Sequence, residues 1–365
     1  MASFDEVLKD CTKLGTKIPT NEYLKNGKYP VIDQGQSDIA GYHDSDSGLF
    51  ENVPAIVFGD HTRAVKYVDK PCFLGADGVK LLCPLDKDIN CKYLFYQLSC
   101  ADIPNTGYNR HFKWVKALDF KIPSSNEQNH VVEVLDKVTE LISLRKQQLA
   151  KLDELVKARF VEMFGDDIYP KVKVSRVCDF ITKGTTPPNN LISEKYSSDK
   201  VPYLKVYNLS FTGKLLFDTA PQYVPENIHN GVLARSKVYP NDVLMNIVGP
   251  PLGKFALVTD EFSEWNINQA IAIFRSKEKV NPKYLLFALM QPEVLKPFLR
   301  QAVGIRQLNL SLAQCRDLEI PLPPLSLQSE FAAFVERVDQ QKQTVQQSLE
   351  KLELMKKALM QEYFG

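Results

Sequence analysis

Two short clusters of basic and amide side chains occupy matching places in the two halves of the chain, each shortly before an Ile-Pro pair. They are Tyr108-Asn-Arg-His-Phe-Lys113, with the candidates Asn109, Arg110 and Lys113, and Gly304-Ile-Arg-Gln-Leu-Asn309, with the candidates Arg306, Gln307 and Asn309. Arginine, asparagine and glutamine form paired hydrogen bonds with the edges of guanine and adenine in the major groove of DNA. Either cluster alone is also typical of a surface loop, but the recurrence favours a shared role in binding nucleic acid.

Two further groups have side chains suited to contacts with phosphate. His61, Arg63 and Lys66 follow a short apolar run and are predicted to lie on an exposed turn, because no apolar neighbour favours their burial. Lys183, Thr185 and Thr186 belong to the segment Lys183-Gly-Thr-Thr-Pro187, a flexible loop whose hydroxyl groups can bond phosphate oxygens. Both groups therefore join the candidate DNA-contacting residues.

The sequence lacks the motifs of a self-contained enzyme that acts on nucleic acids. It has no G-x-x-x-x-G-K-S/T phosphate loop, no G-x-G-x-x-G dinucleotide turn, and no N-P-P-Y or D-P-P-Y segment of an amino-methyltransferase. The one Asp-x-Lys triplet, Asp119-Phe-Lys121, has the repeat counterpart Asp317-Leu-Glu319, so its lysine is not shared. The histidines lack ligand spacing and the cysteines lack a C-x-x-C pair. We therefore expect no catalytic centre, no cofactor and no metal in this chain, and reduced cysteines in its core.

Charge and hydropathy predict a cytoplasmic protein with no membrane partner. Lys and Arg number 45 and Asp and Glu 44, so the net charge of +1 does not indicate polyanion binding by the chain as a whole. Residues 166–316 carry an excess of Lys and Arg, which either serves local phosphate contacts or is random solvated charge. No apolar run approaches the roughly 20 residues of a bilayer span, and the first residues have no signal-sequence pattern.

The chain contains an internal repeat with a period of about 200 residues. Leu149, Lys151, Leu152, Lys157, Ala158, Glu162, Phe164 and Gly165 recur as Leu349, Lys351, Leu352, Lys357, Ala358, Glu362, Phe364 and Gly365. Asn90-Cys-Lys-Tyr-Leu94 is matched by Asn281-Pro-Lys-Tyr-Leu285. Each half therefore consists of a variable segment, 1–123 or 166–321, followed by a more constant segment, 124–165 or 322–365.

Each constant segment is predicted to be one long helix. Apolar residues recur at spacings of three and four, which is the heptad pattern of a coiled coil, and no glycine or proline interrupts either segment after Gln128 and Gln328. One such helix cannot hide its apolar seam alone, so we expect the two to pack antiparallel. Bulky side chains near the helix ends are expected to stay exposed and to bind partner proteins: Phe160, Met163, Phe164, Tyr363 and Phe364.

The variable segments are predicted to be α+β domains. Short β-rich runs at 55–58, 79–83, 243–248 and 270–274 are separated by turn-forming residues, and helices are expected at 92–99 and 282–290. The predicted fold class is therefore α+β, with two mixed globular domains and two long antiparallel coiled-coil helices in a pseudo-twofold internal repeat.

This layout resembles the specificity subunit of type I restriction-modification systems. The resemblance lies in the order of the parts, in Gly184-Thr-Thr-Pro187, in the Phe-Gly helix ends, and in the two helix entries, Ile122-Pro-Ser-Ser-Asn-Glu-Gln128 and Ile320-Pro-Leu-Pro-Pro-Leu-Ser-Leu-Gln328. It covers nearly the whole chain. The first half departs from the pattern, because it lacks the Pro-Pro pair and has only Gly15-Thr-Lys-Ile-Pro19 in place of the Gly-Thr-Thr-Pro motif.

The resemblance implies a non-catalytic subunit that recognises a bipartite target in double-stranded DNA. Each variable segment would be a target recognition domain for one half-site, and the helices would set the unread gap. Methylation subunits, usually two, would dock on the helices and use S-adenosylmethionine, and a restriction subunit would add cleavage that needs ATP and magnesium. Two alternatives stay open: a coiled-coil adaptor that reads no DNA, and a stand-alone DNA-modifying enzyme with an unfamiliar motif.

Overall fold

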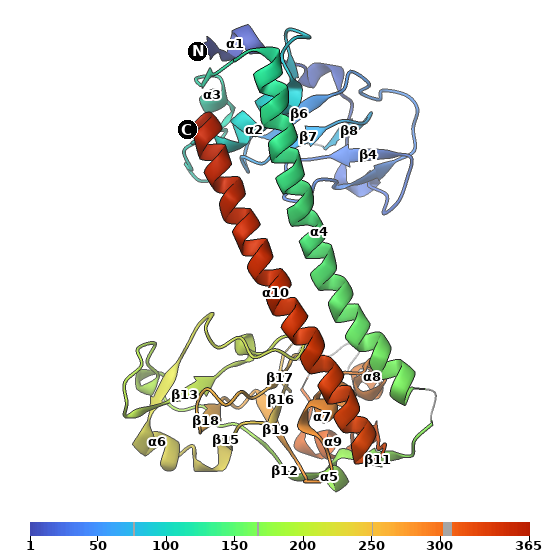
Figure 1. Ribbon diagram of the computed structural model, residues 1–365, viewed down its shortest axis with the longest axis vertical. Helices are drawn as coiled ribbons and strands as arrows, with labels where there is room; N and C mark the ends of the chain where they lie inside the picture. Colours follow the sequence, from blue (N-terminus) through green and yellow to red (C-terminus); the bar gives the residue numbers. More distant parts are fainter. Residues whose placement is uncertain (76, 166–167, 250, 302–308) are drawn as a thin grey trace. The chain divides into compact units, whose positions relative to one another are not determined.

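The chain is organised as two compact units, shown in a computed structural model that describes residues 1–75, 77–165, 168–249, 251–301 and 309–365 (Figure 1). Unit 1 comprises Met1–Gln147 and Val345–Gly365, and unit 2 comprises Gln148–Thr344. Each unit contains one globular domain and a part of both long helices, α4 (Ser125–Phe164) and α10 (Leu325–Phe364). In the described parts of the chain, no helix combines the length and apolar character needed to span a lipid bilayer.

The globular domain of unit 1 combines two four-stranded sheets with short helices. The first sheet has the order β2-β9-β6-β7 and is antiparallel throughout, and the second has the order β3-β8-β4-β5. The elements are β1 (Ala2–Ser3), α1 (Phe4–Val7), β2 (Leu8–Asp10), η1 (Thr12–Leu14), β3 (Lys17–Ile18), η2 (Thr20–Glu22), β4 (Tyr29–Ile32), β5 (Gly41–His43), β6 (Ala55–Gly59), β7 (Val65–Val68), β8 (Phe73–Gly75), β9 (Val79–Pro84), α2 (Cys91–Cys100), α3 (Phe112–Val115) and β10 (Asp119–Phe120).

The globular domain of unit 2 repeats this plan. Its first sheet, β12-β19-β16-β17, is also antiparallel throughout, and its second has the order β14-β13-β18-β15. The elements are β11 (Lys171–Lys173), α5 (Val174–Val177), β12 (Cys178–Lys183), η3 (Asn189–Leu191), β13 (Lys200–Leu204), η4 (Val206–Asn208), β14 (Tyr223–Pro225), α6 (Glu226–Asn230), η5 (Ala234–Ser236), β15 (Lys237–Val238), β16 (Val243–Asn246), β17 (Phe255–Leu257), β18 (Trp265–Ile267), β19 (Ile271–Ser276), α7 (Pro282–Leu289), α8 (Pro292–Gln301), α9 (Leu312–Asp317) and β20 (Glu319–Pro321).

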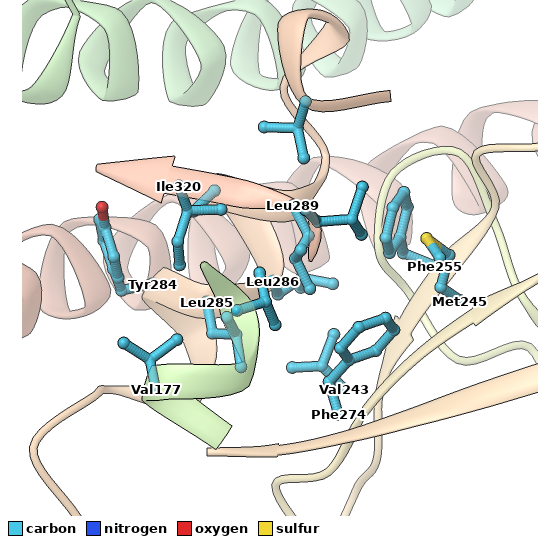
Figure 2. Packing of buried hydrophobic residues seen from close by; sticks show 14 of the residues in the cluster. Val177, Val243, Met245, Phe255, Phe274, Tyr284, Leu285, Leu286, Leu289 and Ile320 are labelled. Atoms are coloured by element: carbon cyan, nitrogen blue, oxygen red, sulfur yellow. The ribbon is translucent and has the colours of Figure 1, made fainter. Parts of the chain in front are cut away.

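The core of unit 2 lies between the first sheet and the helices. Figure 2 shows Phe255 and Phe274 of the sheet beside Leu286 of α7, and all three side chains are almost fully buried. Phe160 of α4 and Phe331 of α10 belong to the same cluster, so the long helices form part of the core. The predicted fold class, α+β domains with long antiparallel helices in an internal repeat, is confirmed.

Helices α4 and α10 pack antiparallel within each unit. Several apolar seam positions that the heptad pattern predicts are buried, including Leu135, Val138, Val338 and Leu349, whereas the predicted seam residue Met355 is 43% exposed. Polar contacts flank the seam: in unit 1, Arg145 with Ser348 and Lys146 with Glu353, and in unit 2, Asp153 with Lys342 and Arg159 with Glu330. In unit 2, the later residue of α4, Arg159, pairs with the earlier residue of α10, Glu330, as expected for antiparallel helices.

A buried glutamine anchors each globular domain to its long helix. Gln128 of α4 accepts a hydrogen bond from the backbone N–H of Asn90 and donates one to the Pro123 carbonyl, both at 2.9 Å. The asparagine in turn caps helix α2 through its side chain, which accepts from two backbone N–H groups. The counterparts in unit 2 are Gln328, Asn281 and Pro323. The Asn-x-Lys-Tyr-Leu segment and the downstream glutamine therefore recur in both halves because they make the same contact between globular domain and long helix.

Replacing Gln128 with leucine is expected to destabilise unit 1 by about 1–3 kcal/mol, because two partly buried backbone groups, the Asn90 N–H and the Pro123 carbonyl, would lose their partner. Gln328→Leu should do the same to unit 2. The two tryptophans, Trp114 and Trp265, lie one in each unit, so urea unfolding followed by fluorescence separates the two effects. The exposed Gln147 of α4 gives the control variant Gln147→Leu. A Gln128→Leu protein as stable as this control would contradict the prediction.

The cysteines behave as core thiols. All are free, and all but the half-buried Cys100 are buried. Burial raises the pKa of Cys72 and of Cys178 to about 12. The prediction of core thiols is confirmed.

Candidate nucleic-acid interface

In unit 1, the hairpin loop between β6 and β7 meets the loop that precedes α3. The His61 ring stacks on Tyr108 with 4.6 Å between ring centroids, and His61 Nδ1 lies 3.2 Å from the Asn109 carbonyl oxygen. Arg63 Nη1 donates a hydrogen bond to the Ile103 carbonyl at 2.9 Å. The fold therefore brings together two candidate groups that lie 48 residues apart in the sequence.

A buried pair, Asp60 and His111, locks these two loops together. The Asp60 carbonyl accepts hydrogen bonds from the His111 backbone N–H at 2.8 Å and from His111 Nδ1 at 2.9 Å. The Asp60 carboxylate accepts from the Phe112 backbone N–H at 2.8 Å. Because a carbonyl can only accept, Nδ1 of His111 carries the hydrogen, and Nε2 faces the Thr106 hydroxyl at 3.3 Å. Both side chains are buried, so they support the loops rather than the surface.

The candidates from the second loop lie on the surface of unit 1. Asn109, Arg110 and Lys113 are all exposed, and the Lys113 ammonium lies over the ring of Trp114 at 5.2 Å from its centroid. The loop before α3 and the first turn of that helix therefore expose the Tyr108 ring, the Asn109 amide and the cations of Arg110 and Lys113 within six consecutive residues. The side chains suit hydrogen bonding to bases and charge pairing with phosphates.

Lys66 does not lie on an exposed turn, contrary to the expectation from the sequence. It is the second residue of strand β7, where alternate side chains point inward, and it is 5% exposed. Its ammonium group donates to the Ser37 carbonyl at 2.5 Å and lies 3.4 Å from the Asp33 carboxylate. The alternation of side chains along β7 therefore places Lys66 inside the domain, where the Asp33 carboxylate and the Ser37 carbonyl bind its ammonium group.

Unit 2 presents the equivalent pair of loops. The segment that precedes α9 pairs with the loop after β16, through a bridge between Asn309 and Val248 and a hydrogen bond from Leu310 N–H to the Ile247 carbonyl at 2.8 Å. Asn309 is exposed. The candidates Arg306 and Gln307 lie outside the described residues.

The Gly184-Thr-Thr loop of unit 2 is held by the second sheet and by an arginine. A Cβ atom at Gly184 would stand 2.0 Å from the Asn268 carbonyl oxygen, so the close approach requires glycine. The Tyr203 hydroxyl donates to the Thr185 carbonyl at 3.1 Å, and Arg235 Nε donates to the Thr185 hydroxyl at 2.9 Å. The Gln269 backbone N–H lies 3.4 Å from the Thr186 hydroxyl, while Lys183 is exposed.

A buried polar network lies beneath this arginine. Asn266 Nδ2 donates to His229 Nδ1 at 3.0 Å, so Nε2 carries the hydrogen and donates to the Glu264 carboxylate at 2.9 Å. The Ser236 hydroxyl donates to Asn266 Oδ1 at 2.8 Å. Burial lowers the pKa of His229 despite the bond to Glu264, and the same bond lowers the pKa of Glu264. The network fixes the segment that carries Arg235.

Two residues of the interface, Tyr108 and Arg235, were not among the candidates from the sequence. Tyr108 stands in the cluster that drew attention to Asn109 and Arg110, and its aromatic type beside polar residues was the available signal. Arg235 had no local signal, because its partner Thr185 lies 50 residues away. In the part of the chain that the structure describes, no group of three or more His, Cys, Asp or Glu side chains is arranged to hold a metal ion.

Both repeats match one protein family. Residues 5–154 and 169–354 match the type I restriction modification DNA specificity domain. The chain belongs to this family. Each matched segment includes nearly all of one globular domain and a part of the following long helix, so the family pattern is present twice.

Similar proteins include one curated relative and two solved structures. The type I restriction enzyme EcoR124I/EcoR124II specificity subunit of Escherichia coli is 23% identical over 230 residues, which are 57% of this chain and 54% of that protein. The chain thus spans about half the length of the curated relative that it matches. The type I restriction-modification S subunit of M. genitalium has a TM-score of 0.55, and a chain of a type I R-M system studied for complex assembly and conformational transition has 0.56. Both are 16% identical, and each match covers 100% of this chain and 95% of that chain, so the fold is shared.

The helix-end aromatic residues of this family member are not exposed, contrary to the expectation from the sequence. Phe160 and Phe164 are each 3% exposed, because they pack on Tyr284 and Phe331 in the core of unit 2. The half-buried Met163 packs against the same core. The half-buried Tyr363 and Phe364 pack against the core of unit 1. In unit 2 the partners come from α7 of the globular domain and from α10, and the heptad pattern of α4 alone does not show them.

Other apolar side chains of the two helices do reach the surface. They are Leu141, Leu144, Leu155 and Val161 on α4, and Leu325, Leu354 and Met355 on α10. Leu354 is the most exposed of them at 67%. Where such side chains gather into one apolar patch, the patch is typical of a contact with another protein.

Proposed function

We propose that this chain recognises a bipartite sequence in double-stranded DNA, with one half-site for each globular domain, and that α4 and α10 carry methylation subunits to it. In this proposal the chain catalyses nothing itself. S-adenosylmethionine binds to the methylation subunits, of which two are expected, and ATP and magnesium bind to a restriction subunit where one joins the complex. The complex acts in the cytoplasm.

The observation that carries the proposal is the repeated loop pair in a chain of a DNA specificity family. In unit 1, the loop between β6 and β7 meets the loop before α3. In unit 2, the loop between β16 and β17 meets the segment before α9. Exposed amide or basic side chains lie on the second loop in both domains, at Asn109, Arg110 and Asn309. One chain therefore has two separate surfaces with the side chains of base readers, as a split target requires.

Methylome sequencing of host DNA with and without the gene tests this function directly. We expect a methylated motif of two short half-sites with an unread gap, present only when the gene is present. A continuous motif, or a methylome that does not depend on the gene, would overturn the proposal.

Two measurements on the purified chain separate the alternatives. We expect it to bind duplex DNA with an affinity that falls steeply as salt rises, because phosphate contacts release counterions. A coiled-coil adaptor would not bind DNA. We also expect no methylation or cleavage by the chain with S-adenosylmethionine or magnesium alone, whereas a stand-alone enzyme would act without partners.

Leu144→Lys and Leu354→Lys are each expected to weaken binding of a methylation subunit by about 30-fold, the loss of ~2 kcal/mol that marks a central interface residue. Both positions lie on the helices of unit 1, are exposed, and leave the core untouched. Co-purification and titration of the complex measure the effect. Leu14→Lys changes an equally apolar residue that is 64% exposed in the globular domain and should have no effect. Full binding by both helix variants would place the docking surface elsewhere.

A further inference from the structure

We propose that Tyr108 is a specificity-determining residue of the unit 1 domain, whose ring, stacked on His61, contacts the 5-methyl group of a thymine in the major groove. The inference rests on the proposed function, because it assigns a base contact within the half-site that this domain reads. It goes further in naming the residue, the residue that positions it, and the chemical group on the DNA.

Tyr108 is held out into solvent by a rigid frame. Its side chain is 86% exposed, and among the large hydrophobic residues of the described segments only Met1 is more exposed. The loop is nevertheless fixed, because the buried His111 bonds Asp60 and because Arg63 bonds the Ile103 carbonyl at the start of the loop. Exposing an aromatic ring forgoes the free energy of burying it, so a fixed, exposed ring indicates a ligand that covers it.

The stack on His61 determines which kind of DNA contact the ring can make. The two rings are nearly parallel, at 8°, with centroids 4.6 Å apart, so one face of Tyr108 is covered. A ring that inserts between base pairs needs both faces free, which excludes a wedge here. The free face and edge can contact a groove instead, and thymine provides the one apolar group on the base edges of the major groove.

The neighbours of Tyr108 suit the same groove. Asn109 and Arg110 follow it directly and are exposed, with side chains that hydrogen-bond to adenine and guanine. His61 Nδ1 donates to the Asn109 carbonyl, so one residue orients both the ring and the start of this polar pair. His61 is therefore a positioning residue, and Tyr108 makes the contact.

The test uses the complex with methylation subunits and duplexes of its motif in which each thymine in turn is replaced by deoxyuridine, which lacks the methyl group. For the wild type, one replacement in one half-site should weaken binding about fourfold, the factor that corresponds to ~0.8 kcal/mol for one buried methyl group. Tyr108→Ala should bind the unmodified target more weakly and lose the response to that replacement. Tyr108→Phe should keep the response, because the ring is retained. His61→Ala should reduce it below twofold.

Controls separate this contact from folding, from charge and from the proposed function. Tyr196→Ala removes a ring that is 60% exposed in the other domain, and it should respond like the wild type. The salt dependence of binding should be unchanged in Tyr108→Ala, because tyrosine carries no charge to a phosphate. Wild-type binding to duplexes with one scrambled half-site, measured first, tests the proposed function separately. If that recognition is intact, two results would overturn the role of Tyr108: a wild-type complex that tolerates every thymine replacement, or a Tyr108→Ala complex that keeps the response. Base unstacking detected by 2-aminopurine fluorescence would also overturn it, because it would show that the ring inserts between base pairs.

Discussion

Insertion of four residues into both long helices is expected to lengthen the unread gap of the methylated motif and to leave both half-sites unchanged. Helix α4 passes from unit 1 into unit 2 after Gln147, and α10 passes from unit 2 into unit 1 after Thr344, so these are the two insertion points. Four residues add about 6 Å of helix, close to two base pairs at ~3.4 Å each. Methylation of the original motif should fall by about 100-fold or more, because a wrong gap presents several mismatched pairs to one domain at ~1–3 kcal/mol each.

Methylome sequencing measures both the loss of the old motif and the appearance of the new one. Four residues are close to one helical turn, so the apolar seam continues to face its partner on both sides of the insertion. The control is the same insertion in α4 alone, which shifts one helix against the other and should abolish both motifs. A double insertion with an unaltered gap would show that the helices do not measure the distance between half-sites.

The sequence predicted the elements whose pattern is local and complete. The runs at 55–58, 79–83, 243–248 and 270–274 correspond to β6, β9, β16 and β19, the two inner strands of each antiparallel sheet, because strands covered on both faces are continuously apolar. Helices expected at 92–99 and 282–290 are α2 and α7. Outer strands such as β2 and β17 have only three residues each, too few to establish a period, and were not predicted.

The candidate site was predictable only where the residues of one surface are neighbours in the chain. The cluster at Asn109 and Arg110 is such a case, and the structure exposes both. The pairing of His61 with Tyr108, and of Arg235 with Thr185, joins residues from separate loops, and no spacing rule links them. Lys66 shows the converse, because its burial depends on Asp33 and Ser37 on a distant segment.

The helix-end aromatic residues were misjudged for the same reason, and Phe160→Ala tests what they do instead. We expect this change to destabilise unit 2 by about 3–5 kcal/mol, the cost of deleting a large buried side chain. The Phe160 ring packs against Phe164, Tyr284 and Phe331, with centroids 5.1, 5.8 and 5.4 Å away. These partners come from α4, α7 and α10, so the cavity would open where both long helices meet the globular domain of unit 2.

The measurement is urea unfolding in a Trp114→Phe background, in which Trp265, fully buried in unit 2, is the only tryptophan. Val161→Ala is the matched control. Val161 follows Phe160 in the chain, but its side chain is 54% exposed, so truncating it should change the free energy of unfolding by less than about 0.5 kcal/mol. Binding of a methylation subunit is measured in parallel at low temperature. A Phe160→Ala chain that keeps its Trp265 transition but loses that subunit would show that Phe160 is a docking residue after all. Loss of the transition together with the subunit would show that the aromatic cluster holds the helices in the domain, and that docking depends on it only through the fold.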